Sequence, residues 1–141
     1  MPFPVAQQRL AAYALDLPAL RRDSQAALRE GLRLSDADLA SATPIEVLNA
    51  PVRHHPGVTM MPLRWQRRAA PDDEMPLLDA NLEVVNAGRG TVRLTAVGSY
   101  RPRSRAAAAD GTDADERTAE IMLRALLLRV AAAIGSVPAD R

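Results

Sequence analysis

Three runs in which apolar and polar residues alternate lie between Thr59 and Pro102, and they constrain the fold more than any other feature of the chain. They read MPLRW, LLDANLEV and TVRLTAVGSYRP, and NAGRG separates the second run from the third. A period of two places successive side chains on opposite faces of a β-strand. A short turn with glycine between two such runs indicates a hairpin. The pattern therefore predicts antiparallel strands over residues 58–67, 77–86 and 91–100.

The lengths of the two connecting loops predict which residues lie opposite one another. If each loop is symmetric, Arg64 faces Asp79 and Glu83 faces Arg93, so opposite charges pair on the outer face. A slip of one residue would exchange the two faces, so this agreement supports an antiparallel arrangement. On the inner face the same loops pair apolar residues: Leu63 with Ala80, and Ala80 with Ala96.

A fourth strand is expected before these three. Apolar and polar residues alternate from about Pro44 to Arg53, and RHHPG then indicates a turn, because a Pro-Gly pair breaks regular structure. Pro62 has no N–H to donate to a neighbouring strand, so an edge or a bulge is expected beside it.

Helical patterns flank the sheet region. Apolar residues at helical spacing predict helices over 5–16 and 19–30, with Gly31 as the C-cap of the second. The longest helix is expected over 113–134, where a broad apolar face is followed by Gly135.

Together these elements predict one α+β domain over residues 1–141. A helical N-terminal part (1–40) precedes a curved antiparallel sheet of at least four strands (43–102), and a long C-terminal helix (112–135) packs on the sheet. A chain of 141 residues, 48% hydrophobic and 25% charged, is long enough for one core and too short for two.

Composition argues against several kinds of partner. The formal net charge is +1 and aromatic residues make up 3% of the chain, so we expect no nucleic-acid surface, although Arg101, Arg103 and Arg105 form a basic tract beside Tyr100. There is no cysteine, which removes disulfides and thiolate chemistry and fits a reducing cytoplasm. Without a signal-peptide pattern or a run of about 18 apolar residues, we expect a cytoplasmic protein that is not embedded in a membrane.

The clusters of ionisable residues do not predict catalysis, a metal or a cofactor. His54 and His55 are adjacent, so their side chains point in different directions and do not form a chelate. The acids at 72–74 lack calcium-loop spacing, and those at 110–115 precede a helix, whose N-terminus they stabilise. The acids of the strand over 77–86 are expected to pair with arginines, which would keep them ionised. No nucleophile elbow, Walker loop or dinucleotide motif is present.

The inner face of the sheet is the best candidate for a binding site. Ala80, Ala96 and Gly98 are small and cluster there, which permits either a filled core or an apolar pocket beneath the C-terminal helix. In the second case the N–H of Trp65 and the O–H of Tyr100 would orient a ligand. The expected ligand-binding residues come from the three strands and that helix: Leu63, Trp65, Leu78, Ala80, Leu82, Leu94, Ala96, Gly98, Tyr100, Met122 and Leu126.

The runs MPLRW (61–65), LLDANLEV (77–84) and TVRLTAVGSYRP (91–102), followed by a long C-terminal helix, resemble SRPBCC proteins of actinobacteria. Those proteins belong to the START-like, helix-grip superfamily, in which a curved antiparallel sheet wraps a long C-terminal helix around an apolar cavity. The resemblance covers about residues 41–135. It implies a fold but no particular reaction, because the superfamily includes lipid carriers, hormone receptors and polyketide cyclases.

Three functions stay open at this point. The first is a non-catalytic module that binds a small hydrophobic molecule between the sheet and the C-terminal helix. The second, implied by the resemblance alone, is an enzyme of the polyketide cyclase or aromatase type, for which Tyr100 is the one ionisable candidate on the inner face. The third is a structural or homodimeric domain, because Leu126, Leu127 and Leu128 are consecutive and cannot all face one sheet.

Overall fold

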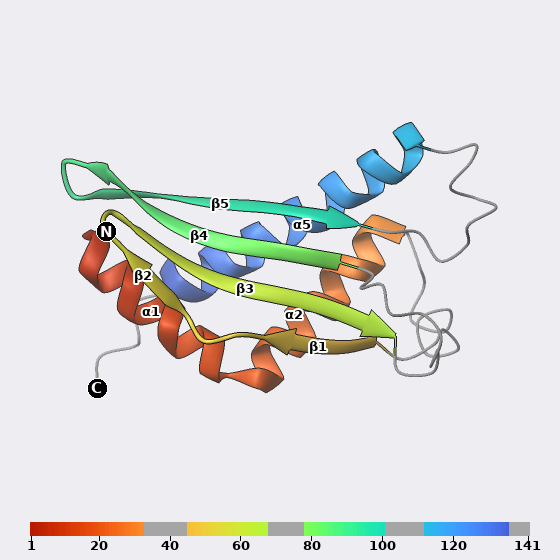
Figure 1. Cartoon of the computed structure of the whole chain (residues 1–141), viewed down its shortest axis with the longest axis horizontal. Coiled ribbons are helices and arrows are strands. Elements are labelled where there is room, and N and C mark those ends of the chain that lie inside the picture. The colour runs from red at the N-terminus through yellow and green to blue at the C-terminus, as the bar shows by residue number, and fades with distance from the viewer. Residues whose placement is uncertain (33–44, 68–77, 101–111, 136–141) are drawn as a thin grey trace.

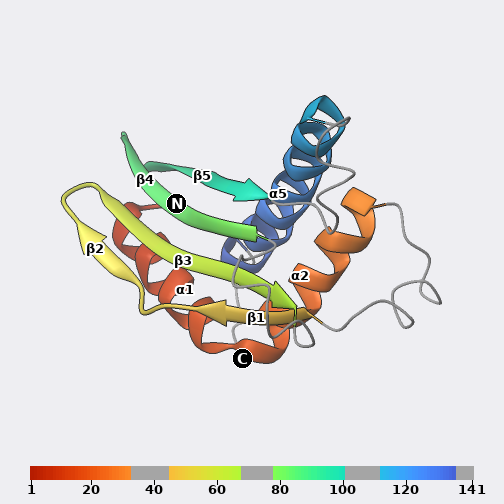
Figure 2. The same cartoon turned by 45° about the vertical axis from the view of Figure 1, so that its right-hand side comes forward.

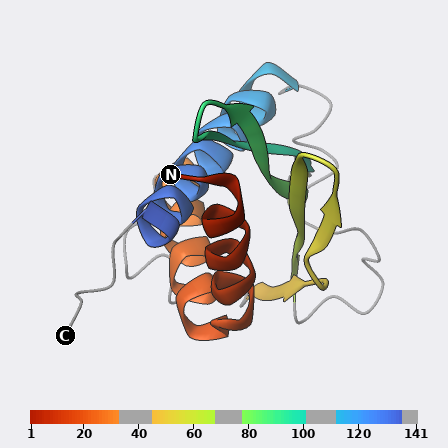
Figure 3. The ribbon, with the colours of Figure 1, turned by 90° about the vertical axis from the view of Figure 1, so that its left-hand side faces the viewer.

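A computed structural model describes residues 1–32, 45–67, 78–100 and 112–135. They form two layers: a curved, open antiparallel sheet of five strands, and three helices that cover one of its faces (Figures 1 and 2). Figure 3, which views the molecule from one end, shows these helices together on one side of the sheet. The predicted α+β class is confirmed, including the two N-terminal helices and the long C-terminal helix packed on the sheet.

Two helices joined by a single residue form the N-terminal part, α1 (Phe3–Leu15) and α2 (Leu17–Leu32). Asp16 makes the corner. Its backbone leaves the helical conformation (φ −89°, ψ 75°), which ends α1. Its Oδ1 accepts a hydrogen bond from the backbone N–H of Ala19 at 3.2 Å, which caps α2. Both helices begin two residues earlier than predicted, because Pro4 in α1 and Pro18 in α2 are tolerated in the first turn, where a missing N–H is not needed.

The sequence predicts Gly31 as the C-cap of α2, but the helix continues to Leu32 and includes this glycine. A Cβ at this position would overlap the side chain of Met122 in α5 (Thr112–Gly135). The missing side chain therefore lets α2 and α5 pack closely around Met122, so this glycine serves helix packing.

The sheet pairs every strand with its neighbours in antiparallel orientation. The strands at 58–67 and 91–100 have the predicted bounds, and Arg64 lies opposite Asp79 as predicted. The strand order is β1-β3-β4-β5, with β2 also beside β3. The strands are β1 (Ile45–Asn49), β2 (Arg53–His55), β3 (Val58–Arg67), β4 (Leu78–Gly88) and β5 (Thr91–Tyr100).

The strand predicted over 44–53 is interrupted and becomes β1 and β2. The turn predicted from RHHPG is correspondingly shorter, since Arg53–His55 pair with β3 and only Pro56 and Gly57 form the turn. The interruption lies beside Pro62, whose carbonyl accepts a hydrogen bond from the N–H of Ala50 at 3.2 Å. Proline has no N–H to return to that neighbour. The irregularity expected beside Pro62 is therefore confirmed.

The pairing predicted between β4 and β5 is wrong by two residues. Because the shift is even, the same side chains still face inwards, but the predicted charge pair on the outer face does not form. Glu83 lies opposite Thr95 and not Arg93, and Ala80 lies opposite Gly98 and not Ala96.

The geometry of the β4–β5 turn explains this shift. Arg89 and Gly90 have positive φ angles of 53° and 71°, which are the angles of a tight two-residue hairpin turn. A bulge between Asn86 and Gly88 then takes up one residue of β4. A symmetric five-residue loop, which the prediction assumed, would need neither feature.

The core lies between the sheet and the helices. Each of its members is at most 9% exposed, and burying one large apolar side chain stabilises the fold by about 1.5 to 3 kcal/mol. The largest members from the sheet are Met61, Leu63, Trp65, Leu78, Leu82 and Val84, and those from the helices are Leu10, Leu20, Met122, Leu126 and Val130.

Candidate functional site

The inner face of the sheet consists of rows of residues that lie side by side across β3, β4 and β5. The rows bring together all nine strand residues that the sequence predicted for a ligand site. The side chain of Tyr100 is outside the described part of the structure, although its backbone pairs with Leu78. The four rows are Trp65–Leu78–Tyr100, Leu63–Ala80–Gly98, Met61–Leu82–Ala96 and Thr59–Val84–Leu94.

Coverage by the helices changes along each row. The members from β3 and β4 are at most 3% exposed. In the same rows, β5 is less covered: Leu94 and Ala96 are half-buried and Gly98 is exposed. Since β5 is the edge strand of the order, the inner face is closed over the middle of the sheet and incompletely covered along this edge.

Gly98 is required by the close approach of β4 and β5. A Cβ at this position would lie 2.6 Å from the Cβ of Ala80 and 2.6 Å from the backbone oxygen of Asp79. Real Cβ atoms do not approach a backbone oxygen so closely, so any larger residue would push the two strands apart. The small residues noticed in the sequence thus have a packing role at this point.

The C-terminal helix contributes both buried and half-buried residues. Met122 and Leu126, the two predicted ligand-binding residues of α5, are fully buried. As expected for consecutive leucines, Leu127 is half-buried and Leu128 is 66% exposed.

The helix α5 also carries two half-buried apolar residues, Leu123 and Leu127. Successive helical residues are about 100° apart, so Leu123 and Leu127 lie on the flank away from the contact between Met122 and α2. Both are half-buried, and α5 also packs against β5. We call this region the β5–α5 seam, and its residues are Leu94, Ala96, Gly98, Leu123 and Leu127.

Trp65 supplies a buried polar group on the inner face. The residue is 0% exposed, and its indole Nε1 has no hydrogen-bond partner among the residues that the structure describes. It lies between Val47 of β1 and Leu78 of β4, both of which are buried and apolar. Buried donors almost always have a partner, so this N–H is an exception that requires an explanation.

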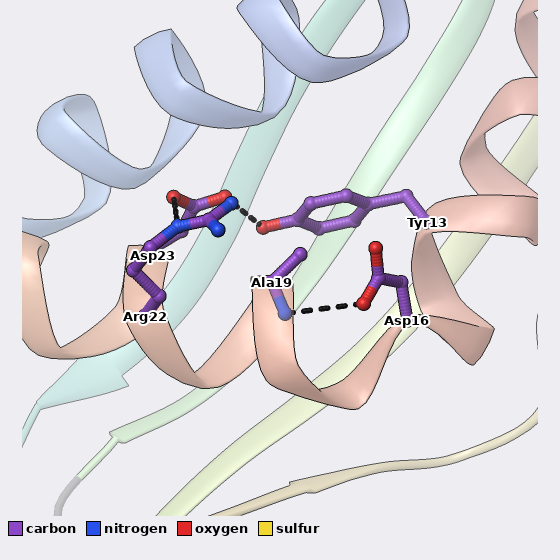
Figure 4. Close-up of polar contacts among 5 residues, drawn as sticks. All are labelled: Tyr13, Asp16, Ala19, Arg22 and Asp23. Carbon is purple, nitrogen blue, oxygen red and sulfur yellow. Dashed lines mark hydrogen bonds and ion pairs between the residues drawn. The ribbon is translucent and has the colours of Figure 1, made fainter.

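A second buried polar group lies at the corner of α1 and α2 (Figure 4). The hydroxyl of Tyr13 donates to Oδ2 of Asp23 at 2.8 Å, and Nε of Arg22 lies 3.7 Å from the other oxygen of that carboxylate. Burial raises the pKa of the Tyr13 phenol well above its usual value, and the hydrogen bond to Asp23 raises it further. A phenol held neutral by its carboxylate partner acts as a structural donor between the two helices.

Two grooves formed by described residues lie away from the inner face of the sheet. One of about 430 Å³ adjoins the Tyr13–Asp23 pair, and one of about 410 Å³ lies where the α1–α2 corner meets the connection between β1 and β2. Neither contains a residue predicted for ligand binding. The first is lined by Arg9, Ala12, Tyr13, Asp16, Ala19, Arg22 and Ala133, and the second by Ala11, Ala14, Leu15, Leu17, Asn49, Ala50, Pro51 and Val52.

His54 and Asp79 make structural contacts. Nδ1 of His54 lies 3.1 Å from Oγ1 of the buried Thr59, which also accepts a hydrogen bond from Nε2 of Gln7 at 2.7 Å. Asp79 accepts a hydrogen bond from Arg64 at 3.1 Å, as predicted. Within residues 1–32, 45–67, 78–100 and 112–135, no three metal-binding side chains gather at one point.

The remaining charged groups considered in the sequence are outside the described side chains. These are the acids at 72–74 and 110–115 and the arginine tract at 101–105.

Sequence reasoning missed the contacts of Tyr13 and Thr59. Helical spacing puts Tyr13 on the apolar face of α1 and does not indicate its partner, because Asp23 is on another helix. A buried tyrosine generally needs a partner for its hydroxyl, which was the one available signal. Which acid supplies that partner depends on the angle between α1 and α2, and helical spacing does not give that angle.

The chain matches no protein-family model, no curated protein and no solved structure. The resemblance to START-like proteins therefore stays a prediction from the sequence runs. In the described residues, no helix is both long enough and apolar enough to cross a membrane.

Proposed function

We propose that this protein binds a small apolar molecule along the β5–α5 seam, between the sheet and the C-terminal helix. The observation that carries the proposal is the uneven coverage of the inner face. Rows that are fully buried on β3 and β4 end in half-buried or exposed apolar residues on β5.

The apolar residues of the β5–α5 seam stabilise the fold less than they would if they were fully buried. A leucine or valine contributes about 1.5 to 3 kcal/mol only when it is fully removed from water, and the leucines of the seam are only partly buried. A molecule that covers them would recover part of that free energy. Binding sites for small molecules are mostly apolar surfaces of this kind with few polar groups.

The chemistry of the inner face supports binding without catalysis. The described inner residues of β3, β4 and β5 include no ionisable side chain that would act as an acid, a base or a nucleophile. The cyclase-type alternative depends on Tyr100, whose side chain is not described. A neutral, apolar ligand suits the residues that are described.

The single tryptophan of the chain provides the test. N-phenyl-1-naphthylamine is uncharged, its emission rises in apolar surroundings, and it accepts energy from tryptophan. Titration into the protein should produce saturable energy transfer from Trp65. Absence of saturable transfer at high micromolar probe would overturn the proposal.

A pair of adjacent substitutions on β5 localises the site. Ala96→Leu adds bulk to the seam and should weaken probe binding at least tenfold, or about 1.4 kcal/mol. Val97→Leu is the matched control, since Val97 is on the outer face and 64% exposed. Equal affinity in the two variants would place the probe elsewhere.

A further inference from the structure

We infer that the groove between α1, α2 and the end of α5 binds a zwitterion of the length of a short peptide, with its carboxylate at Arg9 and its ammonium at Asp16. The groove has a volume of about 430 Å³, and both residues line it. Neither residue has an ion-pair partner in the described part of the chain. The inference is independent of the proposed function, because this groove is separate from the β5–α5 seam.

Arg9 is held in place by a neutral partner. Its Nη1 donates a hydrogen bond to the backbone oxygen of Ile134, near the end of α5, at 2.7 Å. A guanidinium has five N–H donors in a rigid plane, so donors remain for a carboxylate once this bond has fixed the group. A backbone carbonyl carries no net charge, so the positive charge of Arg9 is not neutralised by this contact.

Asp16 supplies the opposite charge. Its Oδ1 accepts a hydrogen bond from the N–H of Ala19, and its Oδ2 can accept from another donor. Arg22 also lines the groove, but its Nε lies 3.7 Å from the carboxylate of Asp23, so its charge already faces an acid. Figure 4 shows Asp16 near the backbone end of the Tyr13 side chain, away from Arg22 and Asp23. The carboxylate of Asp16 is therefore the acid that an ammonium would meet.

The two free charges select the class of ligand. A simple anion would pair with Arg9 and share the groove with an acid of the same charge, and a simple cation would meet the opposite conflict. A zwitterion pairs with both ends. The lining also includes small or apolar surface, contributed by Ala12, Tyr13, Ala19 and Ala133.

The spacing of the charges sets the length of the ligand. Arg9 and Asp16 are seven residues apart, which is about 10 Å along a helix and two turns later on the same face. A peptide chain spans at most about 3.3 to 3.6 Å per residue, so a tripeptide with free termini has the required length. Alanine at three places in the lining favours small side chains on that peptide.

Trialanine and its two blocked forms test the inference on the wild-type protein. N-acetyl-trialanine lacks the ammonium, and trialanine amide lacks the carboxylate. Titration with trialanine should give saturable shifts of the Ala12, Ala19 and Ala133 amides in ¹H–¹⁵N spectra. Each blocked form should bind at least about threefold more weakly, because it loses one ion pair. Absence of saturable shifts with millimolar trialanine, or equal binding of all three peptides, overturns the inference.

Two substitutions assign the ends of the ligand. Asp16→Asn keeps an acceptor for the N–H of Ala19 and should remove the preference for trialanine over its N-acetyl form. Arg9→Gln should remove the preference over the amide. Asp79→Asn and Arg64→Gln are the matched controls, because these two residues pair with each other outside the groove, and both preferences should survive in them.

The variants also define how the inference fails. A preference that survives in Asp16→Asn or Arg9→Gln, or that is lost equally in the matched control, overturns the assigned position. If Arg9→Gln does not fold without the contact to Ile134, the wild-type comparison of trialanine with its amide decides whether the carboxylate is bound. The apolar probe at the seam is measured separately, so failure of one site leaves the other standing.

Discussion

The α1–α2 corner and the interior of the sheet each bury an aromatic residue with a hydrogen-bond donor, and they differ in whether that donor has an acceptor. At the corner, the hydroxyl of Tyr13 has its acceptor 2.8 Å away on Asp23. In the sheet, the N–H of Trp65 is also buried and has no acceptor within the described part of the chain. The Tyr13–Asp23 pair is complete by itself, so it belongs to the fold. The sheet interior leaves a buried donor without a partner among the described residues, so burial there does not by itself secure a hydrogen bond.

The largest expected effect comes from removing the hydrogen bond between Tyr13 and Asp23. Tyr13→Phe leaves the buried Asp23 carboxylate without its hydroxyl donor, and hydrogen bonds to charged groups contribute about 1.5 to 3 kcal/mol. Urea unfolding should show a loss of that size. Asp23→Asn keeps an acceptor for the hydroxyl and should cost about 1 kcal/mol. A loss below about 0.5 kcal/mol for Tyr13→Phe would mean that the contact does not hold the corner together.

A somewhat smaller effect is expected at the seam, where the strands meet without room for a side chain. Gly98→Ala should destabilise the protein by about 2 kcal/mol, because its Cβ would meet the backbone oxygen of Asp79 and the side chain of Ala80. Gly135→Ala is the control, since a Cβ there meets nothing within 4 Å. An equal change in the thermal unfolding midpoint of both variants would show that β4 and β5 can move apart enough to admit the added Cβ.

The smallest effect is a dependence on alkaline pH that is specific to the corner. The pKa of Tyr13 is raised in the folded protein, so the folded state keeps a proton that the unfolded state loses above about pH 10. Stability should therefore be constant below that pH and fall by about 1 kcal/mol between pH 10 and 11. The chain has no lysine or cysteine to titrate in this range. Urea midpoints that fall equally in Tyr13→Phe would assign the effect to another group.

Prediction from sequence succeeded where a local pattern carries the information. Strict alternation gave the bounds of β3 and β5 and the pairing of Arg64 with Asp79, because the pleat fixes which way each side chain points. It failed at the β4–β5 turn, where Arg89 adopts a positive φ that a non-glycine residue rarely takes. It also failed at Gly31, whose role depends on Met122, far along the chain.

The sequence by itself determined which residues face the interior, including the small residues of the seam and the indole of Trp65, because side-chain direction follows from the period of a strand or helix. Tertiary structure alone decided how well each of them is covered and which polar groups find partners. Those outcomes depend on where α5 crosses the sheet and how α1 meets α2. Alternating residues with the same pattern on β4 and β5 therefore ended with different exposure, fully buried on one strand and half-buried on the next.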